Sequence, residues 1–164
     1  MRRLTIDVIM NAPAFRNTLK ERELDLRGNK IPRIENLGVT QDQFDVIDLS
    51  NNQIEVLEDF PVLKRCTTIF MHNNIVKTIG ENFAECLPNL HTLMLSNNDI
   101  KEFKDIMPLR KCKNLLRLSL YLNPITTLPN YKLIMIKLIP SLRFLDFQRI
   151  TKEERDKSDK LIIG

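Results

Sequence analysis

One spacing pattern recurs along the chain and limits the shapes that it can adopt. The pattern reads apolar-x-apolar-x-x-Asn-x-apolar, where x is any residue. The copies begin at Leu24, Ile47, Ile69, Leu93 and Leu118. The asparagines lie 23, 22, 24 and 25 residues apart, at Asn29, Asn52, Asn74, Asn98 and Asn123. A unit this short cannot bury its own apolar side, so the pattern indicates a stack in which neighbouring units bury it together.

This period is typical of leucine-rich repeats. Each apolar-x-apolar run predicts a short strand whose two apolar side chains share one face, while the residues around them share the other. The asparagine side chain carries two donors and an acceptor, which suits it to pair with backbone groups where the chain leaves the strand. The sequence therefore predicts an α/β fold, a solenoid of five repeats and a partial sixth with a parallel sheet on its concave face. The alternative, an ordinary helical protein, would show spacings of three and four instead.

A repeat stack needs a cover at each end. Thr5 is suited to cap a short helix at the N-terminus, and Thr151 with Glu154 matches the capping box that opens a helix. A sixth strand with inward apolar side chains is predicted from Leu142, Leu145 and Phe147. We expect a single domain divided into an N-terminal helical cap (1–20), repeats (21–140) and a C-terminal cap with its helix (141–164).

Composition and hydropathy indicate a folded chain without membrane spans. Hydrophobic residues make up 43% and charged residues 28%, as in globular proteins. No uncharged apolar run approaches the roughly 18 residues that a membrane helix needs. Arg2 and Arg3 could begin a signal peptide, but Asp7 interrupts the apolar stretch that follows. We therefore expect a soluble intracellular protein.

The chemically reactive residues do not form a recognisable catalytic or metal-binding motif. Cys66 and Cys112 occupy slots that the repeat assigns to buried apolar residues, and Cys86 has no partner at zinc-ligand spacing. Neither His72 nor His91 has a Cys or Ser partner in a known motif. The four glycines are too scattered to build a phosphate-binding loop. We expect no enzymatic activity, cofactor, metal or small-molecule substrate.

The repeat register assigns three columns of strand residues to the concave face. The first column is Glu23, Val46, Thr68, Thr92, Arg117 and Phe144. The second is Asp25, Asp48, Phe70, Met94, Ser119 and Asp146. The third is Arg27, Ser50, His72, Ser96, Tyr121 and Gln148. Five of these residues would expose apolar or aromatic groups on one sheet, which indicates a partner-binding surface. Incidental exposure, or cover by the tail of the chain, is the alternative.

Charge is distributed unevenly although the whole chain carries only +4. Counting Lys and Arg against Asp and Glu, residues 1–33 hold 8 against 4, residues 34–100 hold 3 against 10, and residues 101–164 hold 14 against 7. Basic ends are compatible with phosphate contacts, and the acidic middle is compatible with a basic or mixed protein helix.

Two strings near the N-terminus resemble a known family. They read R-E-L-D-L-R-G from Arg22 and K-I-P-R-I-E-N-L-G from Lys30. Together with Tyr131, Pro140 and the segment L-D-F-Q from Leu145, they resemble the A-prime proteins of the U2 small nuclear ribonucleoprotein (snRNP), a component of the spliceosome. The resemblance extends over nearly the whole chain.

The resemblance implies a non-catalytic scaffold that acts in pre-mRNA splicing in the nucleus. In this family the concave sheet holds a helix of the B-double-prime protein, which has an RNA-recognition motif, and the pair binds a stem-loop of U2 small nuclear RNA. The partner reads the loop bases, while the A-prime protein adds phosphate contacts. Other spliceosomal proteins are expected as further partners.

We divide the candidate contact residues into two sets. The set expected to contact the protein partner is Asp25, Val46, Asp48, Phe70, His72, Met94, Arg117 and Tyr121. The set expected to contact RNA phosphates is Arg2, Arg3, Lys20, Arg22, Arg27, Arg149 and Lys152. The alternative function is that of a leucine-rich repeat regulatory subunit of a protein phosphatase, or of a nuclear chaperone. The chain lacks the long acidic run that the chaperone type usually bears.

Overall fold

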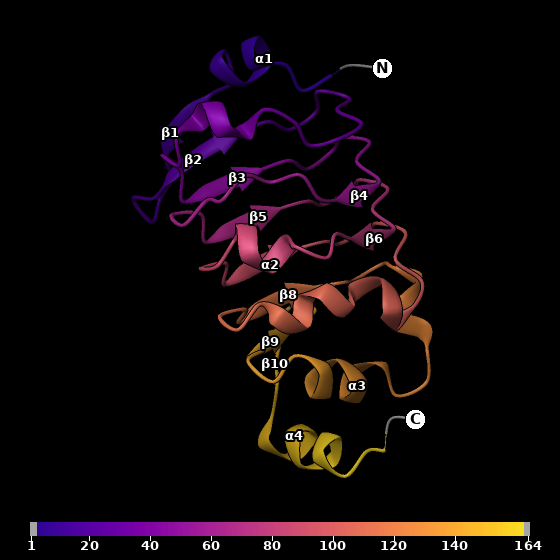
Figure 1. Cartoon of the computed structure of the whole chain (residues 1–164). Coiled ribbons are helices and arrows are strands. Elements are labelled where there is room, and N and C mark those ends of the chain that lie inside the picture. The colour runs from indigo at the N-terminus through magenta and orange to yellow at the C-terminus, as the bar shows by residue number, and fades with distance from the viewer. Residues whose placement is uncertain (1–2, 163–164) are drawn as a thin grey trace.

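Within the described part of the chain, eight strands form one sheet that runs along the molecule (Figure 1). The computed structural model describes residues 3–162. The strands follow one another in chain order as β1 (Ala14–Arg16), β2 (Arg22–Asp25), β3 (Val46–Asp48), β5 (Thr68–Phe70), β7 (Thr92–Met94), β8 (Arg117–Ser119), β9 (Phe144–Leu145) and β10 (Gln148–Arg149). Those from β2 to β9 pair in parallel, while β1 and β10 run antiparallel to their neighbours at the two ends. The parallel repeat sheet predicted from the spacing is thus present.

Short helices and extended segments connect the strands, and one further helix lies before the first strand and one after the last. The helical segments are α1 (Ile6–Met10), η1 (Leu37–Thr40), α2 (Phe83–Cys86), η2 (Phe103–Lys111), η3 (Pro124–Thr127), α3 (Tyr131–Leu138) and α4 (Lys152–Asp159). In two return segments, β4 (Val56–Leu57) and β6 (Thr78–Ile79) pair in parallel. Within residues 3–162, no helix combines the length and the apolar content needed to cross a bilayer.

The core lies between the sheet and the return segments. The predicted inward strand residues are almost completely buried, including Leu24, Ile47 and Leu118 at 2% exposure or less. Cys66 and Cys112 are buried as predicted, and burial raises the pKa of the Cys66 thiol to about 12 and that of Cys112 to about 11. Thiols with such pKa values are protonated at neutral pH, so these two act as small apolar core residues.

The asparagines form an internal ladder between repeats. Asn74 illustrates it: its Nδ2 donates to the carbonyls of Leu49, Met71 and His72, and its Oδ1 accepts from the backbone N–H of Ile54. The amides of Asn52, Asn98 and Asn123 make corresponding bonds and are also buried, and the amide of Asn29 donates to the Leu26 and Arg27 carbonyls of its own repeat. From Asn52 onward, each amide therefore satisfies backbone groups of its own repeat and of the preceding one, as predicted from its donors and acceptor.

Both predicted helix caps are present. The Thr5 hydroxyl accepts from the backbone N–H of Val8 at 3.2 Å, and α1 begins at the next residue. At the other end, the Thr151 hydroxyl accepts from the N–H of Glu154, whose carboxylate accepts from the N–H of Thr151. This reciprocal pair satisfies two N–H groups that would otherwise lack a partner at the start of α4.

The prediction that Phe147 points into the core is wrong. The sixth strand ends at Leu145, and Asp146 and Phe147 adopt left-handed backbone conformations with φ of 51° and 68°. The chain then turns back, so that Gln148 pairs with Leu145 in β10 and does not extend the third column. The Asp146 carboxylate stabilises this turn by accepting from the Leu120 N–H at 2.6 Å and the Tyr131 hydroxyl at 2.8 Å. Phe147 is consequently 64% exposed.

Candidate partner-binding face

Strand pairing aligns the outward-facing residues in the predicted columns. The first column follows the register from Glu23 through Val46, Thr68, Thr92 and Arg117 to Phe144, and the second runs from Asp25 through Asp48, Phe70 and Met94 to Ser119. Backbone hydrogen bonds continue the alignment one step further, because the N–H groups of Asn51, Asn73 and Asn97 donate to the carbonyls of His72, Ser96 and Tyr121. The parallel pairing thus places six members of the predicted partner set in the first two columns, and the hydrogen bonds that follow align His72 and Tyr121 in the third.

The outward face of the sheet is hollowed. A pocket of about 570 Å³ is lined by Asn17, Thr18, Leu19, Glu21, Glu23, Val46, Thr68, Phe70, His91, Thr92 and Arg117. The expectation that Val46 is an exposed apolar contact is wrong, because Val46 is only 2% exposed. It faces outward but is flanked in the first column by Glu23 and Thr68, its register partners in the neighbouring strands. Val46 therefore forms part of the floor of the hollow.

Phe70, His72 and Met94 occupy the centre of this face. Each is half-buried, so each keeps some accessible surface, as predicted. The rings of Phe70 and His72 are stacked, with centroids 6.1 Å apart and an interplanar angle of 24°. Desolvation by burial lowers the pKa of His72, and the nearby Asp48 carboxylate opposes this effect only in part. Near neutral pH, the stacked pair therefore presents an uncharged aromatic surface.

The lowered pKa of His72 predicts a pH-dependent stability. The unfolded chain, in which histidine has a pKa of 6.5, binds the proton before the folded chain does as pH falls. The contribution of neutral His72 to the free energy of unfolding is therefore complete above pH 6.5. It is lost as the pH falls from 6.5 through the lower pKa of His72 in the folded state. Urea unfolding at pH 7.5 and pH 5 should show a smaller loss of stability for His72→Gln than for the parent chain. If the His72→Gln variant and the parent chain lose the same free energy of unfolding between these pH values, the pH dependence comes from other groups.

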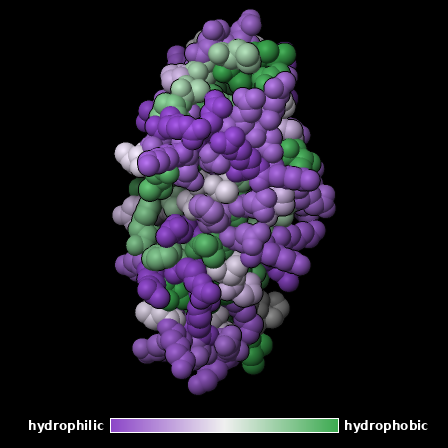
Figure 2. Space-filling model, turned by 90° about the vertical axis from the view of Figure 1, so that its left-hand side faces the viewer, coloured by the Kyte–Doolittle hydropathy of each residue, from purple (hydrophilic) through white to green (hydrophobic). Residues whose placement is uncertain are grey.

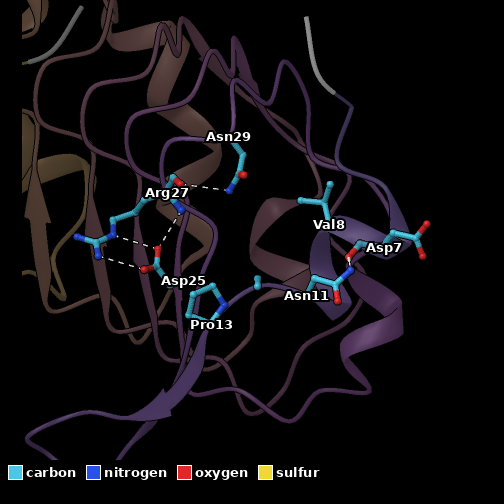
Figure 3. A pocket seen from close by; sticks show the side chains of 8 residues that line it. Asp7, Val8, Asn11, Pro13, Asp25, Arg27 and Asn29 are labelled. Atoms are coloured by element: carbon cyan, nitrogen blue, oxygen red, sulfur yellow. Dashed lines mark hydrogen bonds and ion pairs between the residues drawn. The ribbon is translucent and has the colours of Figure 1, made fainter.

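Charged residues lie at the end of this face nearest the N-terminus. Two guanidinium nitrogens of Arg27 donate to the Asp25 carboxylate at 3.0 and 3.1 Å, and Asp48 lies 3.7 Å from Arg27 Nε. The hydrogen bond from Arg27 holds the pKa of Asp25 below its usual value. Figure 3 shows Asp25 and Arg27 across a pocket of about 390 Å³ from Val8 of α1. Asp25 and Asp48, the two acidic residues predicted to contact the partner, therefore already pair with Arg27 of the same chain.

Aromatic and cationic groups lie at the end nearest the C-terminus. The Arg117 guanidinium lies over the Phe144 ring, 4.9 Å from its centroid. Tyr121 is 54% exposed and meets the displaced Phe147 edge to face, with ring centroids 6.5 Å apart. Arg117 lines the hollow, whereas Tyr121 is not among the residues lining it. The predicted partner set thus extends beyond the hollow at this end.

The hairpin of β1 and β2 is a wall of the hollow that sequence reasoning did not identify. Its turn brings Leu19, which is 76% exposed, to the same pocket as Phe70 and Arg117. Asn17 holds the turn, since its Oδ1 accepts from the N–H groups of Leu19 and Glu21. The sequence signal was weak, because the strands on either side of the turn read A-F-R and R-E-L-D and contain few of the β-branched and aromatic residues typical of strands.

The predicted RNA-binding residues lie in two groups at opposite ends of the solenoid. Arg2 lies outside the described residues. In the N-terminal group, Arg3 pairs with Glu35 at 3.3 Å, the Arg22 guanidinium lies over the Phe44 ring, Arg27 pairs with Asp25, and Lys20 is exposed. In the C-terminal group, Arg149 of β10 and Lys152 of α4 are exposed. The structure therefore does not gather the set into one patch.

Arg16 joins the N-terminal group and was not predicted. It is the register partner of Arg22 and donates to the Lys20 carbonyl at 3.0 Å, which places three cationic residues on one hairpin. Figure 2 shows that hydrophilic side chains dominate one side of the molecule and that apolar side chains occur there in separate groups. Hydrophilic and apolar side chains thus share the face that Figure 2 shows.

Comparison with known proteins places this geometry in a family. A family model described as leucine-rich repeat matches residues 1–164. U2 small nuclear ribonucleoprotein A′ of Arabidopsis thaliana is 50% identical over 98% of the chain, the human protein is 44% identical over the whole chain, and the probable Caenorhabditis elegans protein is 46% identical over the whole chain. The chain spans 64–65% of the length of these relatives.

A solved structure supports the same placement. The crystal structure of the Drosophila melanogaster SNF/U2A′ complex contains a chain that matches with a TM-score of 0.95 and 42% identity. The match covers 98% of this chain and 92% of that one. The chain therefore belongs to the leucine-rich repeat family and, within it, to the U2 small nuclear ribonucleoprotein A′ proteins.

Proposed function

We propose that this protein is a non-catalytic scaffold of the U2 snRNP that acts in pre-mRNA splicing in the nucleus. The observation that carries the proposal is the outward face of the sheet, where Phe70 lines the hollow and its register partner Met94 in the neighbouring strand is also partly exposed. Apolar groups on a hollow surface favour binding of another polypeptide, because their burial removes them from water.

The proposed protein partner is the B-double-prime protein, whose helix would occupy the hollow. An α-helix with side chains is about 10–12 Å wide, and its apolar residues at i, i+3 and i+4 could pack against Phe70 and Met94. Asp25, Asp48 and Arg117 would orient that helix through charge. The fly protein of the same fold was crystallised as a complex of SNF with U2A′, which supports a protein partner.

The proposed RNA contact is with the phosphates of the U2 stem-loop. The support is the exposed Lys20 at one end of the solenoid, with Arg16 and Arg22 on the same hairpin, and the exposed Arg149 and Lys152 at the other. Such side chains bind a phosphate backbone without reading sequence. The chain would therefore strengthen the complex while the partner selects the RNA.

Reconstitution tests both parts of the proposal. Adding the chain to B-double-prime should tighten its binding to the U2 stem-loop by about tenfold, corresponding to about 1.4 kcal/mol. In the ternary complex, Arg149→Gln with Lys152→Gln should lower the slope of log affinity against log salt by about two, because each phosphate contact contributes about one. Lys77→Gln is the matched control, since Lys77 is exposed but pairs with Glu55 in the acidic middle. An unchanged RNA affinity on adding the chain would contradict the scaffold role.

A further inference from the structure

Three large apolar side chains are exposed together beyond the end of the hollow. Tyr121, Leu122 and Phe147 are 54%, 60% and 64% exposed. Tyr121 and Leu122 are consecutive, and the Tyr121 ring meets the Phe147 ring edge to face at 6.5 Å. We call these three residues the apolar end cluster.

The backbone at Leu122 has a conformation that leucine disfavours. Its φ is 61°, in the left-handed region where a branched side chain crowds the backbone. The equivalent position in the three preceding repeats is Asn51, Asn73 and Asn97, with φ of 60°, 57° and 56°. Asparagine tolerates this conformation, and here the side chains are linked, because Asn73 donates to Asn51 at 2.9 Å and Asn97 donates to Asn73 at 2.8 Å. Leucine thus replaces asparagine in the fifth repeat, the one that contains β8.

Phe147 is held in its exposed position by buried groups. It follows Asp146, whose carboxylate binds the Leu120 N–H and the Tyr131 hydroxyl, and both residues have positive φ. Burial and the neighbouring Asp146 raise the pKa of Tyr131, so its hydroxyl remains a donor. Because the backbone of this turn is already fixed, presenting Phe147 to a partner costs little backbone entropy, which favours affinity.

We propose that the apolar end cluster extends the concave binding face and receives an apolar side chain of the same RNA-recognition-motif partner, next to its bound helix. This inference rests on the proposed function. The cluster is continuous with the concave face, because Tyr121 belongs to its third column and its carbonyl accepts from the Asn97 N–H at 2.8 Å. Three side chains alone supply far less than the roughly 1,000 Å² that a specific interface needs, so the cluster fits an addition to a larger interface better than a separate dimer contact.

Asparagine substitutions separate binding from folding. Leu122→Asn should raise the melting temperature by about 2–4 °C, because asparagine suits the backbone conformation and can continue the Asn51–Asn73–Asn97 series. Leu122→Asn combined with Phe147→Asn should weaken binding of recombinant B-double-prime by about fivefold to thirtyfold in calorimetry. Each substitution is also measured singly, so that misfolding of one variant leaves the other informative. Val62→Asn is the matched control, since Val62 is 57% exposed in the segment between β4 and β5.

The results distinguish this inference from the proposed function. If Phe70→Ala with Met94→Ala abolishes binding while the cluster variants bind normally, the cluster has no role and the concave site stands. If neither pair changes affinity, both proposals fail. Self-association of the parent chain in sedimentation equilibrium that Leu122→Asn abolishes would overturn the inference, because a second copy would then occupy the cluster. Weaker partner binding by a more stable Leu122→Asn variant is the result expected.

Discussion

Replacing Asn74 with alanine is expected to lower the free energy of unfolding by about 2–4 kcal/mol. The substitution leaves the Ile54 N–H without its acceptor and removes one of the two donors of each of the Leu49, Met71 and His72 carbonyls. These carbonyls keep their bonds from the Asn52 amide, the Asn98 amide and the Asn51 N–H. The Asn74 side chain is buried, at 7% residue exposure, so water cannot easily replace these bonds. The one buried N–H left unpaired costs about 1–3 kcal/mol, and the weaker pairing of the three carbonyls accounts for the rest.

Urea unfolding followed by circular dichroism measures this effect. Asn114→Ala is the matched control, because Asn114 also donates to a carbonyl, that of Pro88 at 3.0 Å, but is exposed. Its loss should cost no more than about 0.5 kcal/mol, as for most surface substitutions. Similar destabilisation by both substitutions would show that the internal asparagine ladder contributes nothing beyond an ordinary surface hydrogen bond.

Replacing Phe70 and Met94 together with alanine is expected to weaken B-double-prime binding by at least about a hundredfold. The two residues are register partners in β5 and β7 and lie at the centre of the concave face, where truncation of a contact residue typically costs about 2 kcal/mol or more. Because both point away from the core and are half-buried, the fold should survive the change. Calorimetric titration of the partner measures the loss.

The control for this experiment removes a similar amount of exposed apolar surface elsewhere. Val62 and Ile162 are 57% and 93% exposed, and neither belongs to the sheet. Changing both to alanine should leave partner affinity within about twofold of the parent value. If the Phe70 and Met94 variant matches this control, the partner does not bind in the hollow.

The repeat made much of the fold predictable because the neighbours of each strand residue are its counterparts one period away. Knowing the position of Asn52 is enough to place Asn74, and with it the inward Ile69 and the outward Phe70. The same reasoning identified the buried Cys66, whose surroundings are set by stacking alone. Local side-chain chemistry was equally informative at Thr151, where the capping box depends on residues only three positions apart.

Features that depend on contacts outside the repeat could not be read from spacing. Phe147 fits the apolar-x-apolar pattern after Leu145, but the Asp146 hydrogen bonds to Leu120 and Tyr131 turn the chain before that position. Val46 has the predicted register, yet its exposure depends on the size of the side chains beside it. The distribution of cations was also hidden, because Arg16 meets Arg22 only through an antiparallel hairpin at the edge of the repeats.

The antiparallel strands at the two ends have a consequence for colloidal behaviour. A stack of parallel strands with open ends could grow by adding strands of another molecule, as amyloid fibrils do. Here the first strand, β1, is three residues long and the last, β10, is two, and both end in an arginine, Arg16 and Arg149. Short, positively charged edge strands repel those of identical copies and offer them few backbone groups for pairing. Concentrated solutions of this protein should therefore resist fibre formation.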